Sequence, residues 1–91
     1  MATTKTILQA CCGSRTILME TSAPIRKHQI SIVEAAGWTV PESHTAVGLF
    51  YCYNGNIYCS GSFGSNIFKI TVRGGVELTE LEEVLERAVA S

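Results

Sequence analysis

The chain of 91 residues contains no aspartate, and it lacks the cysteine and histidine spacings of common metal motifs. A Ser-His-Asp triad therefore cannot form, and most of the glutamates fall on the predicted solvent face of the last helix. Neither Cys-x-x-Cys nor His-x-x-x-His occurs among the four cysteines, His28 and His44. We therefore predict no catalytic residue, no metal site and no cofactor.

Charge is also scarce, with 16% charged residues against 46% hydrophobic residues and a formal net charge of −1. The lysines and arginines are scattered, and Arg26-Lys27 is their only adjacent pair, so nucleic acid is not an expected partner. A small domain with this much apolar material often buries part of it against another chain. We expect one domain over residues 1–91 that forms a homo-oligomer, most simply a dimer, or docks on a larger protein. A compact monomer is the alternative.

Targeting signals are missing as well. Residues Met1–Leu8 have no apolar core of the length that a secretory signal needs. The longest uncharged stretch, Thr45–Phe68, contains many Asn, Gly and Ser residues, which would leave polar groups unpaired in lipid. The expected location is therefore the cytoplasm, with no membrane partner and with reduced cysteines.

The N-terminal third predicts a hairpin and a helix. A turn at Cys12-Gly13 would set Lys5 opposite Glu20 and Leu8 opposite Ile17, whereas a turn at Gly13-Ser14 would lose the charge pair. In the predicted helix, Ser22 is the N-cap, Pro24 lies in the first turn and Gly37 ends the helix. A strand at Gln29–Val33 is the competing assignment.

The remainder predicts three strands and a second helix. A short extended piece at Trp38–Val40 and a turn at Pro41–His44 precede them. The expected strands are Ala46–Tyr53, Asn56–Ser60 and Ile67–Arg73, and a capping box of Thr79 and Glu82 opens the last helix. The order is β-β-α-β-β-β-α, which indicates a two-layer α+β fold with one antiparallel sheet and two helices packed on one face.

The central hairpin is the most informative segment. A turn at Asn54-Gly55 or at Gly55-Asn56 leaves the side-chain alternation unchanged. One face then carries Phe50, Cys52, Ile57 and Cys59, and the other carries Tyr51, Tyr53, Tyr58 and Ser60. Tyrosine offers a large contact area, and this face has no charged side chain to prevent association. We therefore predict that Tyr51, Tyr53, Tyr58 and Ser60 bind a partner. Ordinary cross-strand pairing of tyrosines is the alternative reading.

A glycine- and serine-rich segment follows the hairpin, comprising Ser60, Gly61, Ser62, Phe63, Gly64 and Ser65. It resembles the glycine loop that covers ATP phosphates in protein kinases, but Cys59 stands where the first glycine belongs and no catalytic-loop motif follows. We expect a flexible connection, with binding of a small anion to its backbone amides as an alternative.

These observations favour a small binding, adaptor or accessory protein that acts through contact and self-associates. The first alternative is a small-ligand, nucleotide or anion-binding module that uses the segment 60–65. The second is a cysteine-based enzyme or redox sensor, in which Cys52 and Cys59 or a Cys-His pair would act.

Overall fold

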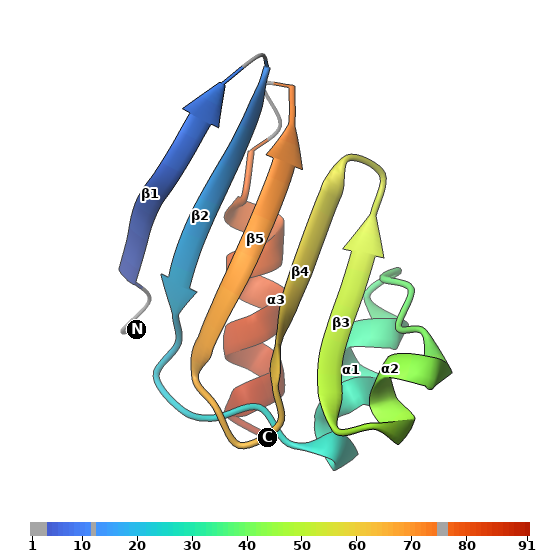
Figure 1. Ribbon diagram of the computed structural model, residues 1–91. Helices are drawn as coiled ribbons and strands as arrows, with labels where there is room; N and C mark the ends of the chain where they lie inside the picture. The colour runs from blue at the N-terminus through green and yellow to red at the C-terminus, as the bar shows by residue number, and fades with distance from the viewer. Residues whose placement is uncertain (1–3, 12, 75–76) are drawn as a thin grey trace.

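The computed structural model describes residues 4–11, 13–74 and 77–91, and it describes side-chain environments for Ile7 and from residue 13 onward outside 75–76. The described chain forms one antiparallel sheet and short helices, which confirms the predicted α+β fold (Figure 1). The strands are β1 Thr4–Cys11, β2 Ser14–Glu20, β3 Leu49–Asn54, β4 Ile57–Ser62 and β5 Ile67–Arg73. The helices are η1 Lys27–Gln29, α1 Ile30–Ala35, α2 Glu42–Ala46 and α3 Thr79–Val89.

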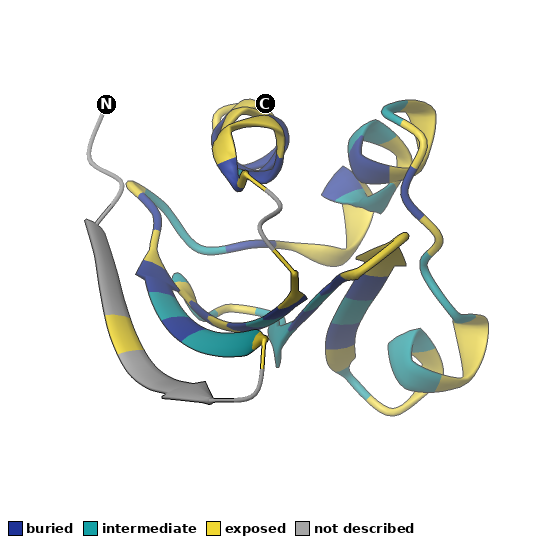
Figure 2. Ribbon diagram, turned by 90° about the horizontal axis from the view of Figure 1, so that it is seen from above, coloured by how far each residue is buried: buried dark blue, intermediate teal, exposed yellow. Residues whose placement is uncertain are grey.

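The strand order in the sheet is β1-β2-β5-β4-β3, and every pairing is antiparallel. The last strand in sequence, β5, therefore lies in the middle and joins the N-terminal hairpin to the central hairpin. Helices α1 and α3 lie on one side of the sheet, while α2 lies beside the β3 edge (Figure 2). This arrangement confirms the prediction of two helices on one face.

The first hairpin is present, but its register differs from the prediction. Cys11 pairs with Ser14 and Gly13 has a φ of +80°, whereas Cys12, the other residue of the predicted turn, lies outside the described residues. The register shifts between Ile7 and Gln9, because β1 carries one extra residue there. Beyond this irregularity Lys5 pairs with Met19, and Ile7 replaces Leu8 opposite Ile17. The predicted pairing of Lys5 with Glu20 is therefore wrong.

The first helix begins later than predicted. Ser22 and Pro24 lie in an irregular segment ahead of η1, and the side-chain oxygen of Gln29 accepts a hydrogen bond from the Arg26 N–H at 2.8 Å. Gly37 follows the helix with φ +97°, the left-handed conformation predicted for it. The predicted role of Ser22 as N-cap is wrong, because its N–H and hydroxyl both donate to Glu86 on α3.

Two further local predictions need correction. The predicted turn at Pro41–His44 is the start of helix α2, whose N-cap is Pro41. Helix α3 is present, but its N-cap is Leu78 and no side chain caps it, so the Thr79 and Glu82 capping box is wrong. The predicted extended piece near Trp38 survives as a single bridge, in which Thr39 and Tyr53 exchange two hydrogen bonds of 3.0 Å.

The hydrophobic core lies between the sheet and the helices α1 and α3. Alternate residues of β3, β4 and β5 point into it, as the sequence alternation predicts. Phe50 and Phe68 are fully buried and meet edge to face, with ring centroids 5.6 Å apart. The helix side chains that complete the core include Val33, Leu81, Val84, Leu85 and Ala88.

Candidate binding face on the open side of the sheet

The sheet face opposite α1 and α3, here called the open face, is flanked by α2 at its β3 edge and is otherwise not covered by a helix or strand among the described residues (Figure 2). The central hairpin presents Tyr51, Tyr53, Tyr58 and Ser60 on it, because Phe50, Cys52, Ile57 and Cys59 point into the core. Asn54 pairs with Ile57, so Gly55-Asn56 forms the two-residue turn. The predicted division of the hairpin into two faces is therefore correct.

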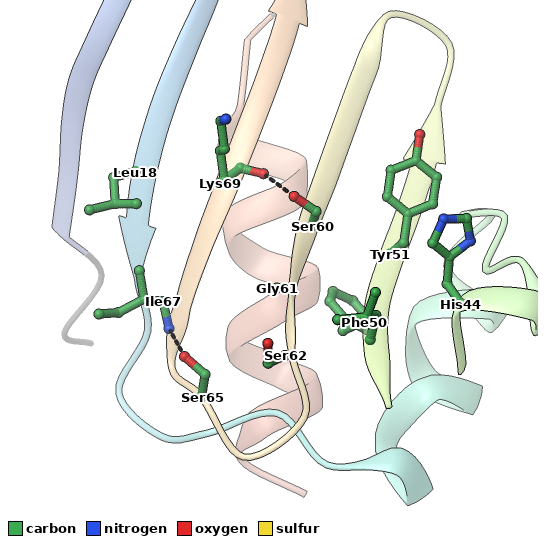
Figure 3. Close-up of a pocket in the computed structure, with 11 residues that line it drawn as sticks. Leu18, His44, Phe50, Tyr51, Ser60, Gly61, Ser62, Ser65, Ile67 and Lys69 are labelled. Carbon is green, nitrogen blue, oxygen red and sulfur yellow. Dashed lines mark hydrogen bonds between the residues drawn. The ribbon is translucent and has the colours of Figure 1, made fainter. Parts of the chain in front are cut away.

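The three tyrosines form a continuous cluster. The ring centroids of Tyr51 and Tyr53 are 6.0 Å apart, and those of Tyr53 and Tyr58 are 6.2 Å apart. The ring of His44 stacks on Tyr51 at 4.8 Å with an interplanar angle of 30°. Sequence reasoning missed His44 as part of this cluster, because only the formation of α2 brings it beside β3 (Figure 3).

Strand β5 adds charge to the open face. Lys69 pairs with Ser60 of β4 on one side and with Leu18 of β2 on the other. Thr71 and Arg73 follow on the same side of β5, since Phe68, Ile70 and Val72 are buried. The tyrosine-bearing hairpin is itself uncharged, but the sheet face around it carries Lys69 and Arg73. The alternation along Ile67–Arg73 indicated these side chains, although their position next to the tyrosines required the strand order.

Two depressions hollow the open face, and they share Tyr51, Ser60 and Lys69. The first has a volume of about 520 Å³, and its apolar lining comes mainly from Leu18, Leu49, Phe50 and Ile67 (Figure 3). The second has a volume of about 460 Å³ and is completed by Tyr58, Thr71 and Arg73. Because the two depressions share three lining residues, we describe them as one groove, which follows β5 from Ile67 to Arg73 and is lined also by β4.

The apolar side of the groove is unusually open to solvent. Leu49 and Ile67, which line the groove, retain 43% and 44% of their accessible surface, and Tyr53, which lies outside both depressions, retains 36%. Val47, at the end of α2 next to β3, retains 70%. Single exposed apolar residues are ordinary, but several exposed apolar and aromatic side chains in and near one groove are typical of a contact surface.

The predicted segment Ser60–Ser65 is not a free loop. Ser60, Gly61 and Ser62 belong to β4, and the half-buried Phe63 packs against Phe50 at a ring distance of 6.0 Å. The backbone N–H groups that follow β4 are already used: Phe63 donates to Gly48, Gly64 to Ile25 and Ser65 to Ser62. These three amides are not available to an anion, so the physical basis of the anion-loop alternative is weak here.

The paired cysteines of the hairpin are buried thiols. Cys52 lies directly opposite Cys59, both are fully buried, and both are free. Hydrogen bonding to the Cys52 thiol, together with complete burial, raises the pKa of Cys59 well above its ordinary value of 9.0. A nucleophilic cysteine needs the opposite shift, so Cys59 does not have the environment of a reactive thiol.

The phenol of Tyr51 is also neutral at physiological pH. Burial, followed by the proximity of Tyr58 and Tyr53, raises its pKa above the ordinary value of 10.0.

No group of three potential metal ligands is found among the residues that the structure describes. Within the same residues, every helix is too short or too polar to cross a bilayer.

Comparison of the chain with protein-family models, with curated proteins and with solved structures finds no match. The open face, with its tyrosine cluster and groove, therefore provides the structural basis for a functional hypothesis.

Proposed function

We propose that this chain is a small, non-catalytic protein-binding module, of the adaptor or accessory type, that acts through the open face of its sheet. The observation that supports this proposal is the cluster of Tyr51, Tyr53 and Tyr58 on the face opposite the helices. Ser60 lies opposite Tyr51 within the same surface. The partner is either another protein or a second copy of the chain.

The energetics of tyrosine favour a contact role. A tyrosine ring buries a large area when it is covered and loses few rotamers, while its hydroxyl tolerates water in the unbound state. Aromatic residues at the centre of an interface often contribute about 2 kcal/mol or more each to binding. Three rings about 6 Å apart therefore provide the kind of anchor on which such an interface is built.

Strand-edge protection supports the same conclusion. The bridge between Thr39 and Tyr53, together with helix α2, occupies the outer edge of β3. Edge-to-edge strand addition at β3 is thus obstructed. A partner of this hairpin would contact its side chains on the open face instead of its backbone edge.

The test uses the double variant Tyr51→Glu/Tyr58→Glu in the full chain. Analytical ultracentrifugation measures self-association, and affinity capture from the native host followed by mass spectrometry measures binding of other proteins. We expect the variant to lose the association that the unchanged chain shows. Circular dichroism should show an unchanged fold, because both side chains lie outside the core.

The matched control is Ser31→Glu/Ala35→Glu, which adds the same two charges to exposed positions of α1 on the other side of the sheet. We expect this variant to associate like the unchanged chain. A monomer that captures no protein, or association that is equally weakened by both double variants, would contradict the proposed function.

A further inference from the structure

We infer that the open-face groove receives an extended acidic segment of a partner protein, with an apolar side chain at one end and carboxylates at the other. This inference rests on the proposed function, because it specifies the chemistry of the partner that the open face binds.

The glutamates of the C-terminal helix lie away from the groove, whereas two cations line it. Glu80, Glu82, Glu83 and Glu86 belong to α3, which lies on the helical side, and Glu77 precedes that helix. In contrast, Lys69 lines both depressions of the groove and Arg73 lines the second. Neither depression is lined by a glutamate from the described part of the chain. The groove is therefore a locally cationic site on a chain of net charge −1.

Among the described strands, Glu20 is the glutamate on this face, and it lies at the margin, while Glu42 belongs to the flanking helix α2. Glu20 lies at the end of β2, opposite Ile67, and its carboxylate accepts a hydrogen bond of 3.4 Å from the side chain of Asn66. Lys69 is two residues further along β5 and pairs with Leu18. The carboxylate of Glu20 thus lies at the apolar end of the face and leaves the opposite end, at Arg73, cationic.

The order of residues along β5 matches an extended ligand. Ile67, Lys69, Thr71 and Arg73 follow one another on the open face with the period of a strand, so one apolar position is followed by two cationic positions with Thr71 between them. The distance from Ile67 to Arg73 is about 20 Å at the usual rise of a β-strand. An extended peptide has the same period, so an apolar side chain near Ile67 would place carboxylates near Lys69 and Arg73.

A second copy docked face to face fits this chemistry poorly. Such an isologous contact would bring Lys69 and Arg73 of each copy towards the same cationic surface of the other. Single-stranded nucleic acid also fits poorly, because only two cations line the described groove and leucine and isoleucine form its other end.

The experiment measures fluorescence anisotropy of labelled synthetic peptides with the full chain. The probe has one leucine followed by alternating serine and glutamate, and it is made in both sequence directions. Its matched controls carry glutamine or lysine in place of glutamate, and a labelled oligothymidylate represents nucleic acid. Titrations up to millimolar protein are repeated at low and high salt.

We expect one direction of the glutamate peptide to bind at least about tenfold more tightly than the glutamine and lysine peptides, and to weaken with salt. Lys69→Glu/Arg73→Glu should weaken this binding about tenfold or more. Lys27→Glu/Arg87→Glu makes the same change in net charge at exposed positions outside the groove and should leave the affinity unchanged.

The remaining outcomes overturn the inference in distinguishable ways. Equal binding of the glutamine peptide, or self-association without peptide binding, would refute the acidic partner. If the observed glutamine-peptide binding or self-association is lost in the Tyr51→Glu/Tyr58→Glu variant, the proposed function stands. Tighter binding of the oligothymidylate would replace the protein partner with nucleic acid. A lack of binding to every probe, in a chain that neither self-associates nor captures a protein, would refute the inference and the proposed function together.

Discussion

Ser22 donates two hydrogen bonds to the carboxylate of Glu86, one from its backbone N–H at 2.9 Å and one from its hydroxyl at 2.8 Å. The two residues are 64 positions apart, so these bonds tie the C-terminal helix to the segment that leads from β2 to α1. Glu86 is 7% exposed, which places a charged group in an environment where its hydrogen bonds are strong.

The first prediction concerns this contact. Glu86→Ala should lower the free energy of unfolding by about 2 kcal/mol, because the Ser22 donors lose a charged acceptor. Urea denaturation followed by circular dichroism measures the change. Glu83→Ala removes an exposed glutamate from the same helix and should leave stability nearly unchanged. Equal effects of the two substitutions would show that the Ser22 contact does not stabilise the fold.

The second prediction concerns Gly61, where β4 passes over the core. A Cβ atom at this position would lie 3.0 Å from Cδ1 of Phe68 and 3.2 Å from the carbonyl oxygen of Ile67. Phe68 is fully buried and has little room to move, so Gly61→Val should destabilise the protein by about 1–3 kcal/mol. Thermal unfolding of Ser62→Val, the next residue in β4 and an exposed one, provides the control. An unchanged stability of Gly61→Val would contradict the close approach.

The third prediction concerns access to Cys52 and Cys59. Both thiols are fully buried, so iodoacetamide should reach them only when the chain opens. In a Cys11→Ser/Cys12→Ser background, alkylation of the folded protein should be about 100-fold slower than in denaturant. Mass spectrometry of quenched samples gives both rates. Rapid alkylation of either residue in the folded state would support the cysteine-based alternative.

Local patterns predicted the parts of the fold that depend on neighbouring residues. Alternation in the central hairpin separated Phe50 and Cys52 from Tyr51 and Tyr53, because successive side chains in a strand point to opposite faces. Gly37 ended its helix as expected, since its φ of +97° suits glycine. These features need no knowledge of distant contacts.

Contacts between distant segments explain the errors. Ser22 resembles an N-cap in sequence, but Glu86 takes both of its donors, and only the packed α3 brings that carboxylate near. Similarly, local patterns do not determine the order of strands in a sheet, so the position of Lys69 beside Ser60 cannot be inferred from either strand alone. The sequence predicted the tyrosine face. The cationic part of the groove depends on the strand order, because it forms where β5 lies between β2 and β4.

The final prediction follows from the raised pKa of Cys59. In the folded state this thiol keeps its proton at a pH where the unfolded chain has already lost it, so the unfolded state binds fewer protons. Its contribution to stability is therefore complete below the ordinary thiol pKa of 9.0 and decreases as the pH rises above that value. One such proton gives a slope of up to about 1.4 kcal/mol per pH unit.

Urea titrations at a series of pH values from neutral to about 10.5 measure this slope. The series spans the ordinary pKa values of thiols and tyrosines. The Cys52→Ala/Cys59→Ala variant should lose the part of the slope that begins near pH 9, whatever its absolute stability. It should retain the part that begins near the ordinary tyrosine pKa of 10.0, because the pKa of Tyr51 is also raised. A variant whose stability falls from pH 9 as steeply as that of the unchanged chain would show that Cys59 is not the protonated, buried thiol of this structure.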